Sequence, residues 1–342
     1  MSKKTSFIPI GTFIVLAIVY QCFADVSDKL KQAQTHQEQR QYAQAEQIYK
    51  QIVKANPGTE DSFQAQKNLA ILYVEWDKQP QAQAALQELI GNFSGHKDIA
   101  AVVTYVADAF RKMERHEKAC EIYRYVVDNW PKDEHAMWSQ MNLVISNTCL
   151  GNNDYAETAF KKLCSDYSGY ELIAKAICLV ADNYRKLEQY EKACELYKRA
   201  LDNKPDVDTA LWSMMGLGIS NLHLGEEFAA QQVFYKLHTD FAEDERMATA
   251  GCLIGDEYRS LEMYDKACEL YQYVIDKWPG TEKAMWSQTN MGNIKLDLGD
   301  ENAARAIFDK VLADFAGHPV LPKAVDLMAY GYYRKALSKN KE

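Results

Sequence analysis

Three pairs of oppositely charged residues recur at a fixed interval and have the chemistry for binding. Within each pair the spacing is i,i+3, and the pairs lie 74 residues apart: Asp108 with Arg111, Asp182 with Arg185, and Asp256 with Arg259. On a helix this spacing places both side chains on one face. Such a pair either belongs to a binding surface or is a solvated ion pair that contributes only tenths of a kcal/mol to stability. Both interpretations stay open.

Three tryptophans follow the same 74-residue interval: Trp138, Trp212 and Trp286. Tryptophan and arginine are the side chains that most often anchor protein interfaces. A tryptophan at a repeated position can equally be a packing residue between neighbouring structural units. The six charged residues and the three tryptophans are therefore the candidate partner-binding set.

The cysteines point to packing rather than to a metal site. Of the eight, Cys120, Cys194 and Cys268 share one repeated position, and Cys178 and Cys252 share another. Cysteine behaves as a small hydrophobic residue in a core, and no C-x-x-C or paired His/Cys spacing indicates zinc. We expect no metal and no cofactor. A bridge between Cys164 and Cys178 is the one disulfide that the spacing allows across a predicted turn.

Catalysis and nucleic-acid binding have no support in the sequence. The chain has no G-x-S-x-G, P-loop, G-x-G-x-x-G or H-E-x-x-H motif, and its seven histidines do not cluster. With 39 basic and 48 acidic residues the net charge is −9, so the basic surface of a nucleic-acid binder is missing. We expect neither an enzyme nor a nucleic-acid partner.

A finer repeat of 37 residues runs through the whole chain. A small residue recurs at this interval: Ala45, Ala82, Ala119, Ala156, Ala193, Ala230, Ala267 and Ala304. A bulky residue follows four places after each one: Tyr49, Leu86, Tyr123, Phe160, Tyr197, Phe234, Tyr271 and Phe308. Small residues let two helices approach closely and the bulky neighbour fills the space beside the crossing. Each unit is therefore predicted to be a helical hairpin.

Turn signals separate the predicted helices. Glycines at positions 151, 225 and 299 stand where a helix should stop, and Pro57, Pro131, Pro205 and Pro279 close every other unit. No clear period-two pattern indicates β-strands.

This pattern resembles the tetratricopeptide repeat (TPR) family, whose usual unit has 34 residues. The resemblance rests on Leu217-Gly218, Tyr184, the eight alanines, Phe234 with its equivalents, and the four prolines. It implies an all-α fold, a right-handed α-solenoid of about eight helical hairpins within residues 25–342. The expected units are 26–62, 63–99, 100–136, 137–173, 174–210, 211–247, 248–284 and 285–321, followed by a cap helix over 322–339.

The same resemblance places the candidate partner-binding set on the concave side of the solenoid. Arg185 and its equivalents would then face away from the seam between the two helices, so that their replacement by alanine should leave stability unchanged. Lys67 and Asn68 do not complete the lysine–asparagine clamp by which some members hold a C-terminal carboxylate.

The N-terminus has the layout of an export signal. Lys3 and Lys4 precede an apolar run, and the small residue Ala24 would suit cleavage before Asp25. The competing interpretation is an uncleaved anchor, because residues 7–23 approach the minimum length for spanning a bilayer. In both cases we expect an exported protein, periplasmic or extracellular, that touches the membrane only through this segment.

These features favour a noncatalytic protein–protein interaction scaffold of the bacterial cell envelope that binds a protein or an extended peptide. Its alternating unit types resemble those of exported bacterial envelope TPR proteins. The alternative function is a carbohydrate-binding or polysaccharide-export accessory protein, with cell-wall polysaccharide stacked on the tryptophans.

The export signal makes a prediction about the mature chain. Sequencing the N-terminus of the protein isolated from its source cells should find Asp25 first, because the small residue Ala24 completes the signal. A chain that keeps Met1 and sediments with the membranes would instead support the anchor.

Overall fold

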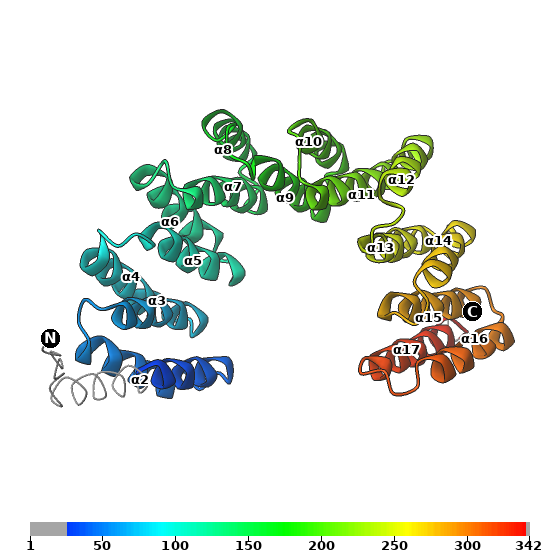
Figure 1. Cartoon of the computed structure of the whole chain (residues 1–342), viewed down its shortest axis with the longest axis horizontal. Helices are drawn as coiled ribbons and strands as arrows, with labels where there is room; N and C mark the ends of the chain where they lie inside the picture. The colour runs from blue at the N-terminus through cyan, green and yellow to red at the C-terminus, as the bar shows by residue number, and fades with distance from the viewer. Residues whose placement is uncertain (1–25, 340–342) are drawn as a thin grey trace, which may run out of the picture. The chain divides into compact units, whose positions relative to one another are not determined.

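The computed structural model describes residues 26–339, which form helices joined by short turns and contain no strand. Residues 26–38 are helical and form the first helix. The helices that follow (Figure 1) are α2 (Tyr42–Ala55), α3 (Glu60–Glu75), α4 (Gln79–Phe93), α5 (Ile99–Lys112), α6 (His116–Asn129), α7 (Glu134–Cys149), α8 (Asn153–Asp166), α9 (Ile173–Lys186), α10 (Tyr190–Asp202), α11 (Val207–His223), α12 (Glu227–Phe241), α13 (Arg246–Ser260), α14 (Tyr264–Lys277), α15 (Glu282–Asp297), α16 (Glu301–Asp314) and α17 (Leu321–Lys339).

Successive helices pair as hairpins, each with a first and a second helix. The helix over 26–38 pairs with α2, α3 with α4, and so on to α15 with α16, while α17 packs on α15 without a second helix of its own. The predicted all-α solenoid of helical hairpins closed by a C-terminal helix is therefore confirmed.

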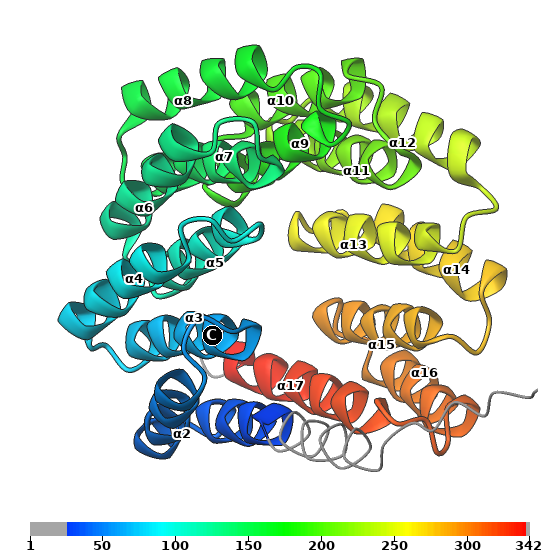
Figure 2. The same ribbon diagram turned by 60° about the vertical axis from the view of Figure 1, so that its left-hand side comes forward.

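The chain forms two compact units, residues 1–176 and 177–342. In the first unit, the first helices α3, α5 and α7 lie side by side. In the second unit, α13, α15 and α17 do the same (Figures 1 and 2). We call the surface that these first helices form the first-helix face of each unit.

The eight alanines of the 37-residue repeat are the tightest points of the packing. Every one of them is 0% exposed. On the opposing helix, a Cβ added to Gly218 or Gly292 would lie 2.1 or 2.2 Å from the ring of Phe234 or Phe308. The second helix thus presses its aromatic residue directly onto the small residue of the first. Ala329 is exposed because α17 has no second helix to cover it.

The turn inside each hairpin needs one residue in the left-handed backbone region. Gly151, Gly225 and Gly299 have φ of 73°, 75° and 87°, so the predicted role of these glycines at the helix ends is confirmed. The same place in the other hairpins has a non-glycine residue with positive φ, at Arg40, Asp77, Glu114, Glu188 and Glu262. The hairpin geometry imposes this conformation even where the side chain disfavours it.

The predicted disulfide is not formed. Cys178 is a buried free thiol, as are Cys120, Cys194 and Cys252. Burial raises the pKa of Cys178 to about 12 and that of Cys252 to about 11. These thiols therefore stay protonated and pack as small apolar groups.

The predicted signal or anchor over residues 1–24 lies outside the described residues. Among residues 26–339, no helix is both long and apolar enough to cross a bilayer.

The buried alanines predict a large cost for added volume. Ala193→Leu, in α10, should lower the free energy of unfolding by about 1–3 kcal/mol, because the crossing helices leave no room for a larger side chain. Urea unfolding would measure it, with Ala313→Leu at an exposed site of α16 as the matched control. Equal stability of the two variants would contradict the close crossing.

Candidate functional site

Each repeated aspartate receives a hydrogen bond from a buried tyrosine of the same hairpin. The hydroxyls of three tyrosines donate to these carboxylates at 2.5 Å: Tyr123 to Asp108, Tyr197 to Asp182, and Tyr271 to Asp256. These tyrosines belong to the bulky positions of the 37-residue repeat, and all three are 0% exposed. The packing residue and the charged pair are therefore parts of one network.

The arginines join the same network, and the expectation that they face away from the helix seam is wrong. The Nε atoms of Arg111 and Arg185 donate to the hydroxyls of Tyr123 and Tyr197 at 3.2 Å. Because each tyrosine hydroxyl reaches across from the second helix to the first, the arginine folds back over the seam. Its long side chain covers the ring there while the guanidinium stays partly solvated.

Arg259 behaves differently from the other two arginines. Its Nη1 donates to Asn290 at 3.3 Å and its Nη2 to Asp297 at 3.4 Å. It therefore links α13 to the neighbouring first helix, α15.

An asparagine on the next first helix completes two of the networks. The Nδ2 of Asn142 donates to Asp108 at 3.2 Å, and that of Asn290 donates to Asp256 at 2.7 Å. In the middle network this place is Gly216, where a Cβ would lie 2.5 Å from the hydroxyl of Tyr197. The sequence contained a signal for these residues, because Asn68, Asn142 and Asn290 follow the 74-residue interval with Gly216 as the exception.

Burial fixes the protonation of these networks. It raises the pKa of the hydroxyls of Tyr123, Tyr197 and Tyr271, so that they remain donors at neutral pH. Burial also raises the pKa of Asp256, against the hydrogen bond from Tyr271. A neutral phenol bonded to a carboxylate holds two helices together and offers no general base that is free to act.

The first pair and the first tryptophan meet in a pocket between α5 and α7, the α5–α7 pocket. It has a volume of about 340 Å³, and its lining includes Asp108, Arg111 and Trp138. Tyr105 and His135, which no repeat in the sequence marks, also line it. The Trp138 indole is half-buried and donates to Glu134 at 3.1 Å.

A second pocket adjoins it on the first-helix face of the same unit. This α3–α5 pocket, of about 390 Å³, shares Tyr105 and Asp108 with the first and adds Lys67, Asn68 and Lys112. Tyr105 is 48% exposed and forms a wall common to both pockets.

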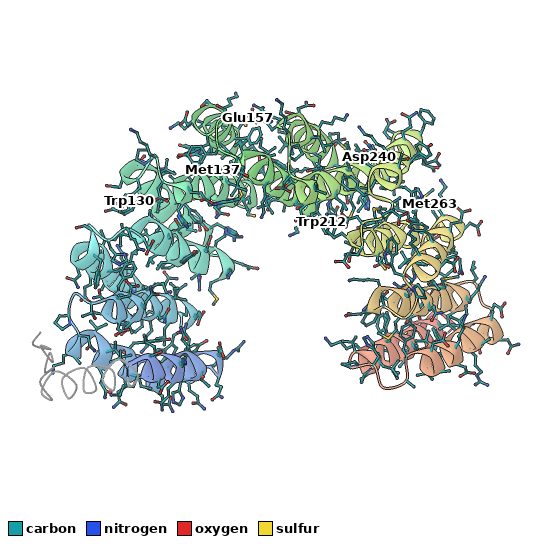
Figure 3. The ribbon with its side chains drawn as sticks, viewed as in Figure 1. Trp130, Met137, Glu157, Trp212, Asp240 and Met263 are labelled. Atoms are coloured by element: carbon teal, nitrogen blue, oxygen red, sulfur yellow. The ribbon has the colours of Figure 1, made fainter. Side chains whose placement is uncertain are left out.

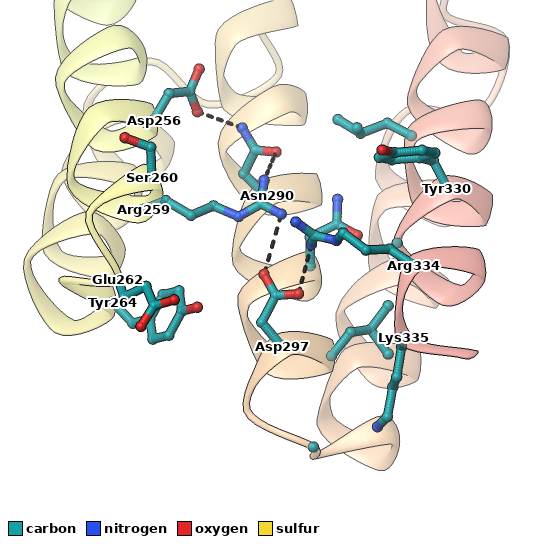
Figure 4. A pocket seen from close by; sticks show the side chains of 15 residues that line it. Asp256, Arg259, Ser260, Glu262, Tyr264, Asn290, Asp297, Tyr330, Arg334 and Lys335 are labelled. Carbon is teal, nitrogen blue, oxygen red and sulfur yellow. Dashed lines mark hydrogen bonds and ion pairs between the residues drawn. The ribbon is translucent and has the colours of Figure 1, made fainter. Parts of the chain in front are cut away.

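The third pair lies in a larger pocket of the second unit, the C-terminal pocket, of about 840 Å³ (Figure 4). Arg259 and Arg334 both donate to the carboxylate of Asp297, and Asp256 and Tyr330 belong to the same lining. Its walls come mainly from α13, α15 and α17. Trp286 does not take part in this lining.

The remaining candidates are not gathered into a pocket with one another. Trp212 and Trp286 are half-buried and pack against the hydrophobic core of the second unit. Trp212 projects from α11 on the side away from α10 and α12 (Figure 3). The Arg185 guanidinium lies 4.0 Å from Glu257, which also contacts His223 at 3.0 Å.

Within residues 26–339, no group of histidine, cysteine, aspartate and glutamate residues is arranged to hold a metal ion. The chemistry of both first-helix faces is thus that of hydrogen bonding, ion pairing and aromatic contact. Whether the candidate residues bind a partner stays a prediction.

Family models of the tetratricopeptide repeat match three segments of the chain, residues 30–75, 104–133 and 174–207. No match to a curated protein was found.

Several solved structures are similar to the chain. A tetratricopeptide repeat protein from Parabacteroides merdae ATCC 43184 is 16% identical, with a TM-score of 0.44 over 78% of this chain and 99% of its own. The apo form of RapI is 12% identical, with a TM-score of 0.47 over 92% and 98%. PilW, described as a widely conserved type IV pilus biogenesis factor, is 14% identical, with a TM-score of 0.43 over 67% and 99%.

The tyrosine networks predict a stability cost that an exposed ion pair would not show. Tyr197→Phe should lower the free energy of unfolding by about 1–3 kcal/mol, because the half-buried Asp182 carboxylate and the Arg185 guanidinium lose their shared partner. Arg185→Ala should cost about 1 kcal/mol. Urea unfolding would measure both, with Tyr155→Phe, at a 68% exposed tyrosine, as the control. Variants as stable as the control would return the pair to a solvated surface role.

Proposed function

Because this chain is a tetratricopeptide repeat protein, we propose that it is a noncatalytic scaffold that binds a partner protein along its first-helix faces. Tetratricopeptide repeats generally bind proteins, and a row of first helices offers a surface that an extended peptide can follow.

The observation that carries this proposal is the placing of the pockets. The α5–α7 and α3–α5 pockets of the first unit lie on the first-helix face, and so does most of the C-terminal pocket of the second. Their linings combine aromatic rings with arginine and asparagine side chains, the groups that give large contact area and directional hydrogen bonds. Two of the three predicted Asp/Arg pairs contribute to them.

The cell envelope is the proposed place of action. Its support is the sequence of residues 1–24, where two lysines, an apolar run and a small residue stand in the order of an export signal. A partner met after export would be an envelope or secreted protein.

Site-specific photo-crosslinking tests the proposed binding face. A photoreactive amino acid at Tyr105 or Tyr330, which are 48% and 58% exposed on first helices, should form an adduct with one discrete protein in the source cells. The same amino acid at Tyr155 or Tyr235, exposed at 68% and 74% on the second helices α8 and α12, is the matched control and should form none.

Mass spectrometry of the adducts identifies what was captured. Equal labelling at all four sites, or no protein adduct at Tyr105 and Tyr330, would contradict a binding face there. Adducts with polysaccharide instead of protein would favour the carbohydrate alternative.

A further inference from the structure

The α5–α7 pocket differs from its equivalents along the chain by two aromatic rings. Tryptophan recurs at 138, 212 and 286, but Tyr105 is replaced by Leu179 and Leu253 at the equivalent positions. His135 is likewise replaced by Thr209 and Lys283. Because the other hairpins fold without these rings, hairpin packing does not require them.

The rings around this pocket are held in fixed orientations. Asp133 caps α7 and accepts from the backbone N–H of His135 at 2.8 Å, and its carboxylate lies 2.9 Å from His135 Nδ1. The His135 ring meets Tyr105 edge to face, with centroids 6.1 Å apart at 85°. The bond from Trp138 to Glu134 fixes the indole on the same helix. A preorganised set of rings loses little entropy when a further ring packs among them.

Most polar groups of the pocket are already bonded to one another. Asp108 Oδ1 accepts from Tyr123 and Asn142, and the Thr104 hydroxyl contacts Ser139 and the carbonyl of Ala100. The exception is Arg111, which within residues 26–339 uses only Nε as a hydrogen-bond donor. A guanidinium has five N–H donors, so the terminal amino groups of Arg111 can still bond a ligand.

This arrangement selects a neutral ring over a charged group or a sugar. A cationic side chain would meet Arg111 at the pocket wall, and an acidic one would meet the carboxylates of Asp108, Asp133 and Glu134 around it. Sugar hydroxyls need several free donors and acceptors, and here the carboxylates are occupied. The volume of about 340 Å³ lies at the low end of ligand pockets, which suits one side chain.

We propose that the α5–α7 pocket receives a single proline or aromatic side chain of an extended peptide segment, with a backbone carbonyl of that peptide accepting from Arg111. This rests on the proposed function and adds the chemistry of the partner. The exposed Tyr105 extends the contact toward the α3–α5 pocket, where the next residues of the peptide would lie.

Peptide selection tests the pocket while the natural partner is still unidentified. The full-length chain would be panned against a random twelve-residue peptide library on phage, in parallel with the double variant Tyr105→Leu, His135→Thr. That variant carries the chain's own residues from the equivalent positions Leu179 and Thr209, so it should fold, and its melting temperature checks this. Peptides selected on the parent should share a proline or aromatic residue at one position.

Fluorescence anisotropy then measures one selected peptide. Its affinity for the double variant should fall about tenfold, because two ring contacts are lost, and Arg111→Lys should weaken it as well. Selected peptides without a preferred ring, a preferred charged residue, or equal affinity for the double variant would overturn the pocket while leaving peptide binding intact.

Two further outcomes separate the pocket from the function on which it rests. Failure of the parent chain to select any peptide would overturn both the peptide scaffold and the pocket. A parallel screen on a cell-wall polysaccharide array, giving binding that is lost in the double variant, would assign the rings to sugar and overturn the peptide proposal.

Discussion

The close crossing of two helices at a small residue is the constraint on which the structure depends. The eight alanines spaced 37 residues apart are completely buried, and an aromatic ring presses on the opposing helix within a distance that a Cβ at Gly218 or Gly292 would not allow. This contact sets the separation of the helices. The separation in turn sets the turn between them, which needs a left-handed residue in every hairpin for which it is described.

The same contact brings polar groups together. Once a tyrosine occupies the bulky position, its hydroxyl emerges on the first helix beside an aspartate and an arginine. The repeated Asp/Arg pairs therefore stabilise the hairpin and also line the pockets of the first-helix face. Structural and binding roles are compatible here, because the carboxylate of Asp108 is saturated by Tyr123 and Asn142 while Arg111 keeps donors that point to no protein acceptor within residues 26–339.

Departures from the repeat are more informative about binding than the repeat itself. Residues that keep the 74-residue interval, such as the tyrosines and asparagines, mainly build the networks that any hairpin of this kind needs. Tyr105 and His135 break the interval and create a ring-lined pocket at one place. Gly216 also breaks it, because the hydroxyl of Tyr197 occupies the space that a side chain would need.

The helices, their pairing into hairpins, the buried alanines and the glycine turns could all be predicted from the sequence alone, because each depends on residues close together in the chain and repeated at a fixed interval. The same repeat selected Asp108, Arg111 and Trp138, which the fold brings into one pocket. The tertiary structure was needed to show that the arginines fold onto the tyrosines, that Asp108 meets Asn142, and that Tyr105 faces His135. These partners are 12, 34 and 30 residues apart, and they meet because the stacking of whole hairpins fixes their distances, which no local pattern encodes.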